Sequence, residues 1–137
     1  MPSEAQMWTR LRPYMVGLGM DPLRVENRVH AGTPDVNFVE GWAELKHTDR
    51  WPKRGGPLRL VHPPTPQQIV WGERRWGSGG NTWLVLRVGQ EWYVFAGNRL
   101  NELWGGGRAP TKAEIEDAAA HSSVHPRFVA EFLKAGR

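Results

Sequence analysis

The sequence predicts an α/β fold in which a central mixed sheet of about five strands is flanked by helices. Two pairs of β-prone runs, each broken by a Gly-containing turn signal, predict hairpins. Segments with helix-start signals lie before, between and after these hairpins. With 137 residues, 39% of them hydrophobic and 23% charged, we expect one domain, residues 1–137, that builds its own core.

The N-terminal segment is predicted to be a helix followed by a strand. Ser3 with Gln6 three residues later is typical of a capped helix start. Apolar residues then recur at helical spacing at Met7, Leu11, Met15 and Leu18. Residues 23–29 alternate apolar and polar side chains, as a half-buried strand does, and place Glu26 on the polar side.

The middle of the chain is predicted to contain a hairpin, a long loop and a helix. Residues 35–46 consist of two short runs around Glu40-Gly41, a turn signal between strands. Residues 47–64 are basic, rich in Pro and Gly and without periodicity, which predicts an unusually long loop. Thr65-Pro66 is a helix start, and the helix is expected to reach about Arg75 with Ile69 and Val70 available for the core.

The C-terminal half is predicted to hold a second hairpin and two helices. The runs 82–88 and 91–95 are strongly β-prone and are separated by Gly89-Gln90. After the glycines at 105–107, which we interpret as a linker, Thr111 and Glu114 have capping-box spacing. A last helix is expected from Pro126 until Gly136 stops it.

The first hairpin carries the strongest candidates for catalytic and metal-binding residues. Side chains alternate along a strand, so Glu44 and Lys46 are expected on one face and Leu45 on the other. Asp35 opens the preceding strand and is expected to face the same cleft. Two carboxylates there would form a hard oxygen site suited to Mg²⁺. The competing interpretation is an Asx-type turn at Asp35 and a solvated ion pair on an exposed strand.

These residues resemble the PD-(D/E)XK nuclease superfamily. The motif is Pro34-Asp35 followed by Glu44-Leu45-Lys46, with Glu26 upstream and Gln67-Gln68 ahead of Trp71 downstream. Over residues 20 to 90 the chain is similar to Holliday-junction resolvases of the phage and archaeal type and to virus-type replication-repair nucleases (VRR-NUC). The resemblance implies phosphodiester hydrolysis that leaves 5′-phosphate and 3′-hydroxyl ends.

The resemblance also implies the roles of individual residues. Mg²⁺, for which Mn²⁺ can substitute, would be held by two carboxylates, a third acid and a carbonyl: Asp35, Glu44, Glu26 and Leu45. Lys46 would orient the attacking water or stabilise charge, and a glutamine would assist, either Gln67 or Gln68, of which Gln68 fits the spacing to Trp71 better. For Glu26 an ordinary ion pair with a neighbouring arginine is the alternative, and for Gln68 a place on the helix surface.

Charge points to a polyanionic partner. The formal net charge is +4, and 14 of the 18 basic residues are arginine, which grips phosphates through its planar fork. We expect DNA contacts from the long loop and the following helix, at Arg50, Lys53, Arg54, Arg59, Arg74 and Arg75. Trp51 and Trp76 could stack on an unpaired base. The alternatives are a solvated basic surface and a codon bias toward arginine.

The sequence therefore predicts a Mg²⁺-dependent, structure-selective DNA endonuclease. A Holliday-junction resolvase acting as a homodimer, plausibly phage-encoded, fits best because two symmetric strands must be nicked in concert. A less structure-selective restriction or repair nuclease is the first alternative, and an inactive DNA-binding module of the same fold is the second. No membrane segment or signal peptide is expected, and the absence of Cys fits a cytoplasmic protein.

Overall fold

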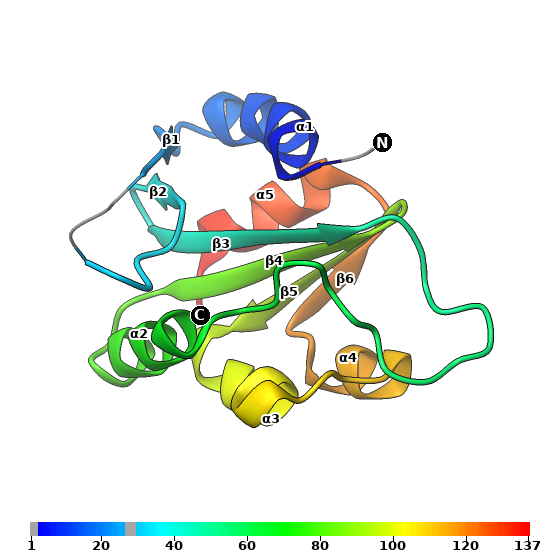
Figure 1. The fold of residues 1–137 in the computed structure, drawn as a ribbon. Helices are drawn as coiled ribbons and strands as arrows, with labels where there is room; N and C mark the ends of the chain where they lie inside the picture. The colour runs from blue at the N-terminus through cyan, green and yellow to red at the C-terminus, as the bar shows by residue number, and fades with distance from the viewer. Residues whose placement is uncertain (1–2, 27–29) are drawn as a thin grey trace.

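The computed structural model, which describes residues 3–26 and 30–137, is α/β with a single mixed sheet (Figure 1). The sheet holds six strands in the order β1-β2-β3-β4-β5-β6 among these residues. Its strands are β1 (Leu23–Arg24), β2 (Val36–Phe38), β3 (Gly41–Thr48), β4 (Thr82–Val88), β5 (Glu91–Ala96) and β6 (His121–Ser123). The helices are α1 (Glu4–Gly17), α2 (Pro66–Gly77), α3 (Leu100–Trp104), α4 (Lys112–Ala118) and α5 (Pro126–Ala135), with short 3₁₀ turns η1 (Gly97–Arg99) and η2 (Gly105–Gly107).

The helices cover both faces of the sheet, α1 and α5 on one and α2, α3 and α4 on the other (Figure 1). Under α1 and α5 the core contains Met7, Leu11, Met15, Ala43, Leu45, Trp83, Val85, Trp92, Val94, Val129, Ala130 and Leu133. On the other face it contains Leu58, Ile69, Leu84, Leu86, Val88, Tyr93, Phe95, Leu100, Leu103, Trp104, Ile115 and Ala118. No helix within the described ranges is long and apolar enough to cross a membrane.

The strand pairing changes from antiparallel to parallel at β3. This strand pairs antiparallel with β2 on one side, up to the pair of Val36 with Ala43, and parallel with β4 along its whole length on the other. Beyond Ala43, β3 therefore runs on past the start of β2 while β4 still supports it. This parallel pairing requires a crossover, which the long loop and α2 provide.

Most predicted elements are confirmed. Both predicted hairpins are present. The second turns at Gly89-Gln90 as predicted, whereas the first turns at Val39-Glu40, one residue before the predicted Glu40-Gly41, because Gly41 already pairs with Phe38 in β3. Ser3, Thr65 and Thr111 each cap a helix by accepting a backbone N–H three residues on. The strand predicted at 23–29 is shorter, since β1 ends at Arg24 and residues 27–29 lie outside the described part of the chain. The sheet also gains β6, which the sequence did not predict because its polar His-Ser-Ser run lacks a strand pattern.

One core prediction is wrong. On α2, Ile69 is buried but Val70 is 60% exposed, and Trp71 takes the inward position instead. Successive helical residues are rotated by about 100°, and on α2 this rotation turns Val70 toward solvent while Ile69 and Trp71 stay buried.

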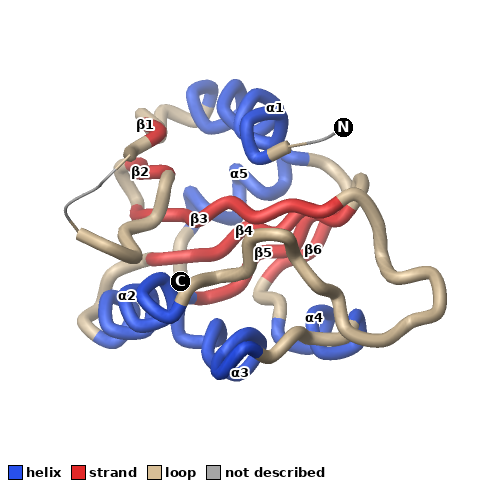
Figure 2. The backbone as a smooth tube through the Cα atoms, in the orientation of Figure 1, coloured by secondary structure: helices blue, strands red, loops and turns tan. Residues whose placement is uncertain are grey.

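The long loop between β3 and α2 covers the face of the sheet that carries α2, α3 and α4. Figure 2 shows it swinging out beyond the end of β3 and returning to α2. Its middle is anchored where Leu58, 3% exposed, packs into the core and its N–H donates to the Pro110 carbonyl at 2.8 Å. The predicted loop is thus confirmed, and it is tied down at a defined point.

Gly32 brings the segment before Asp35 against the start of α2. It has a φ of +88°, and a Cβ placed there would lie 2.3 Å from the Gln67 carbonyl oxygen. Only glycine fits, because both the backbone conformation and the close approach exclude a side chain.

Replacing Gly32 by alanine should therefore destabilise the protein by about 2–4 kcal/mol, combining strain at positive φ with overpacking. Urea denaturation measures this loss. Gly55→Ala is the matched control, because Gly55 has a φ of +73° but a methyl group added there would meet no atom within 4 Å, and it should cost only about 1 kcal/mol. Equal losses in the two variants would contradict the close packing at Gly32.

Candidate active site

The structure brings Asp35, Glu44 and Lys46 together at the stretch of β3 that β2 does not cover. Asp35 immediately precedes β2, and continuing the pairing of Val36 with Ala43 by one residue sets it opposite Glu44. Asp35 Oδ1 accepts a hydrogen bond from the Leu45 N–H at 3.1 Å, which fixes the carboxyl against β3. Lys46 Nζ lies 3.5 Å from Glu44 Oε2. The predicted convergence of these side chains is confirmed.

Burial gives this cluster unusual electrostatics. Glu44 is 8% exposed and Lys46 5% exposed. Burial, followed by repulsion from Asp35, raises the pKa of Glu44 to about 8 although Lys46 opposes the shift. Burial also raises the pKa of Asp35 to about 6, opposed first by Arg24, whose Nη2 lies 3.7 Å from Asp35 Oδ2. Carboxylates held this way bind a cation readily, because a cation relieves both burial and repulsion.

A further acid, which the sequence reasoning missed, acts on the cluster. The charge of Glu4, in the first turn of α1, raises the pKa of both Asp35 and Glu44. Glu26, the predicted third acid, lies two residues after β1 on an exposed position. In sequence Glu4 looks like an ordinary first-turn acid of a capped helix, so only its position over β3 distinguishes it.

Gln68 forms part of the N-terminal cap of α2. Its side-chain oxygen accepts the Thr65 N–H at 3.0 Å, while its own N–H donates to Thr65 Oγ1 at 3.1 Å. This capping box begins α2 and uses the carboxamide oxygen. Gln67 is exposed, and its backbone contacts the Gly32 segment.

The cluster offers oxygen ligands for a divalent cation, but fewer side-chain ligands than a complete protein-only site has. Within residues 3–26 and 30–137, no three His, Cys, Asp or Glu side chains are arranged to hold a metal ion. Mg²⁺ commonly uses only one or two carboxylates, however, with waters and substrate phosphate completing its shell. The Leu45 carbonyl points to the same side of β3 as its N–H, toward the Asp35 carboxyl. The carboxyls of Asp35 and Glu44 and this carbonyl therefore fit Mg²⁺ in chemistry.

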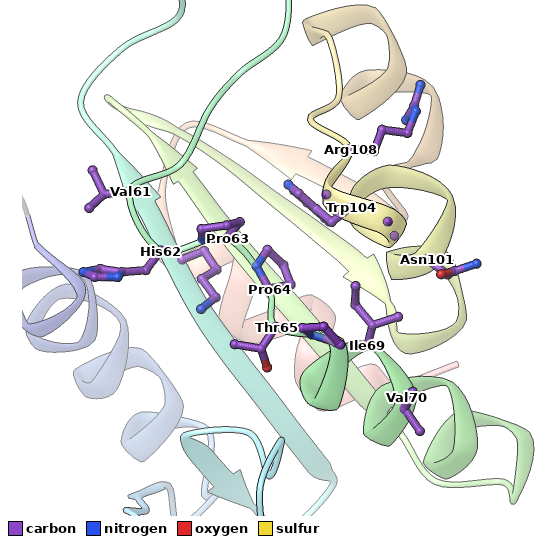
Figure 3. A pocket seen from close by; sticks show the side chains of 15 residues that line it. Val61, His62, Pro63, Pro64, Thr65, Ile69, Val70, Asn101, Trp104 and Arg108 are labelled. Atoms are coloured by element: carbon purple, nitrogen blue, oxygen red, sulfur yellow. The ribbon is translucent and has the colours of Figure 1, made fainter.

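A cleft of about 720 Å³ opens beside Lys46 on the face covered by α2 and α3. Figure 3 shows its walls: the returning loop with Pro63 and Pro64, the start of α2 with Ile69, and α3 with Trp104. Arg108 lies at its rim, and the His62 ring points away from the other labelled side chains (Figure 3). The cleft gives a ligand access to the lysine from the loop side.

The predicted DNA-contacting residues all lie at the surface. The loop residues Arg50, Lys53, Arg54 and Arg59 and the α2 residues Arg74 and Arg75 are exposed. Arg75 also stacks 4.5 Å over the Trp71 ring.

The two tryptophans suggested for base stacking are already engaged. Trp51 donates from Nε1 to Glu91 at 2.6 Å and packs edge-on against Tyr93. Trp76 packs edge-on against Trp83, with Arg137 stacked over it at 4.0 Å. These rings are held within the fold by aromatic contacts, which the sequence could not reveal.

No protein-family model matches the chain, and no curated protein shows significant similarity to it.

The pKa of Glu44 makes the metal-free protein sensitive to pH. Because its folded-state pKa, about 8, exceeds its usual 4.5, the folded state binds the proton more tightly than the unfolded state. Stability is fully present below pH 4.5 and is lost as pH rises toward 8. Asp35 acts in the same sense up to about pH 6.

In EDTA, we expect the free energy of unfolding from urea titrations to fall between about pH 5 and about pH 8, and to fall much less in Glu44→Gln. The exposed acid Glu116 on α4 supplies the control, since Glu116→Gln should retain the wild-type pH dependence. The same slope in wild type and Glu44→Gln would show that Glu44 does not bear the shifted pKa.

Proposed function

We propose that this chain is a metal-dependent nuclease of the PD-(D/E)XK type that hydrolyses phosphodiester bonds in DNA. The observation that carries the proposal is the pair of buried residues Glu44 and Lys46 on the stretch of β3 that extends past β2, with the half-buried Asp35 carboxyl beside them. Two carboxyls and an ammonium are costly to bury without a bound partner. A divalent cation and a phosphate group would compensate them together. The mixed sheet with helices on both faces suits the resembled family's core.

Asp35, Glu44 and the Leu45 carbonyl would hold Mg²⁺ or Mn²⁺. When bound, the cation would neutralise the two carboxylates and stabilise negative charge developing on the phosphoryl group. Glu4 would strengthen the attraction for the cation, because its charge already reaches both carboxyls, although no three acids among the described residues are placed to hold one ion together. Glu26 is the alternative that the sequence motif favours.

Lys46 would act on the reacting phosphate. In-line attack by water spreads negative charge over the phosphoryl oxygens, so a fixed ammonium stabilises the transition state more than the ground state. The pairing with Glu44 keeps this ammonium in place away from bulk solvent. Gln68 would contribute through its side-chain nitrogen, because its oxygen serves the helix cap.

Exposed cations would hold the DNA. The long loop leaves β3 directly after the catalytic residues and carries Arg50, Lys53, Arg54 and Arg59, while α2 carries Arg74 and Arg75. Contacts of this kind position the phosphate backbone without reading sequence. A four-way junction cut by a homodimer is the favoured substrate, with unselective duplex cleavage as the alternative. A module that only binds DNA would have no use for the buried cluster.

The central test is cleavage of a four-way junction, a linear duplex and single-stranded DNA in Mg²⁺, Mn²⁺ or EDTA. We expect paired symmetric nicks in the junction, dependence on the cation, and no cutting by Asp35→Asn. Equal cutting of linear duplex would favour the unselective nuclease. If no DNA is cut under any condition while the protein is folded, the nuclease proposal is wrong.

Lys46→Met should lower kcat by about 10²-fold or more, since a transition-state contact is removed, while Mn²⁺ still raises the melting temperature. Lys53→Met provides the contrast: as a phosphate contact it should weaken DNA binding and leave kcat nearly unchanged. Single-turnover rates and binding isotherms separate the two effects. Similar behaviour of the two variants would refute a direct role for Lys46.

The third acid can be identified in the same assay. Glu4→Gln should reduce Mg²⁺-dependent cleavage and the stabilisation by Mn²⁺ more strongly than Glu26→Gln does. The reverse order would restore the assignment made from the motif.

A further inference from the structure

Within the described part of the chain, Arg87 of β4 is a buried cation without an acidic partner. The residue is 4% exposed, and among the same residues its Nε meets no hydrogen-bond acceptor. Its contacts are a long hydrogen bond from Nη2 to Gln90 Oε1, 3.5 Å, and stacking 5.2 Å over the Trp92 ring. Burial, followed by repulsion from Arg10, lowers the pKa of Arg87. An unpaired buried guanidinium is costly unless a ligand compensates it.

A second arginine faces the same space. A pocket of about 350 Å³ lies between α1 and β4 and is lined by Gln6, Thr9, Arg10 and Arg87. Gln6 and Arg10 are four residues apart and so share a face of α1. Among residues 3–26 and 30–137, no carboxylate lies within 4.0 Å of either guanidinium. Two like charges and two neutral hydrogen-bonding side chains therefore line one pocket.

We propose that this pocket binds a phosphate group, and that in the nuclease it receives a backbone phosphate of the bound DNA. Two guanidinium groups favour a phosphate, because each presents a planar fork of donors to its oxygens. An open pocket reached from solvent suits a phosphate that is part of a chain. The second half of the proposal rests on the proposed function.

The pocket lies close to the cluster along β3, although on the other face of the sheet. Arg87 pairs in register with His47, the residue after Lys46, and faces α1, whereas Lys46 faces the cleft beside α2. On α1, Arg10 lies six residues after Glu4, whose charge reaches the cluster, a rise of about 9 Å. A DNA backbone in contact with both sites would therefore pass around the end of β3 and β4, where Thr48 pairs with Val88.

Arg10→Ala tests the site, because Arg10 is exposed and its loss should leave the fold intact. Arg12→Ala is the matched control: it removes the same charge from the same helix at an exposed position outside the pocket. Arg87→Gln serves as a second variant, with circular dichroism to verify folding.

The first measurement is thermal unfolding in EDTA with inorganic phosphate or with chloride at equal ionic strength. Phosphate should raise the melting temperature of wild type and Arg12→Ala by about 4 °C and leave Arg10→Ala and Arg87→Gln unchanged. The second is junction and duplex binding in EDTA at several salt concentrations. Arg10→Ala should bind about tenfold more weakly, and its slope of log affinity against log salt should decrease by about 0.9.

The outcomes separate the two parts of the proposal. If phosphate stabilises all variants equally, the anion site is refuted. If only phosphate stabilisation is lost in Arg10→Ala while DNA binding and its salt slope are unchanged, the pocket serves free phosphate and the backbone assignment is wrong. If Arg10→Ala and Arg12→Ala weaken DNA binding equally, general charge explains the effect and the assignment is again refuted. An inactive protein that still shows the phosphate effect would support the anion site and overturn the nuclease function alone.

Discussion

The arrangement of this protein depends on one constraint, the burial of Glu44 and Lys46 on a strand that passes through the middle of the sheet. Their backbone is supported by β4 along the whole of β3, while the side toward β2 is left to the Asp35 carboxyl. A side chain thus takes the place that a strand neighbour would hold. Burial raises the pKa of both carboxyls, and repulsion from Asp35 adds to the shift of Glu44, so each holds its proton to a higher pH than an exposed acid does.

The other elements serve this stretch of β3 from several directions. Gly32 lets the segment before Asp35 lie against the start of α2, and the capping box of that helix fixes where it begins. The first turn of α1 brings the charge of Glu4 to the same carboxyls. The long loop returns over the opposite face and, with α2 and α3, forms the cleft beside Lys46. Segments distant in sequence therefore meet at one place on a single sheet.

Local sequence signals accounted for much of this fold. Caps, turn residues and alternation predicted α1, α2 and both hairpins because each depends on contacts within a few residues. Elements governed by distant partners escaped prediction. Strand β6 is polar and exists because β5 offers it an edge, with Val94 opposite His121. Val70 was assigned to the core although the sheet selects Trp71, and the rings of Trp51 and Trp76 proved to be packed against other aromatics.

The sequence by itself determined the hairpin that carries Asp35, Glu44 and Lys46, because side-chain alternation and the turn signal are local properties of the backbone. It also determined the long basic loop and the start of the helix after it. Only the tertiary structure decided that the charge of Glu4 acts on the carboxyls, and that Arg10 and Arg87 face one pocket. Such pairings depend on how helices dock on a sheet, and that docking follows from the shape of the whole core and leaves no trace in the spacing of residues along the chain.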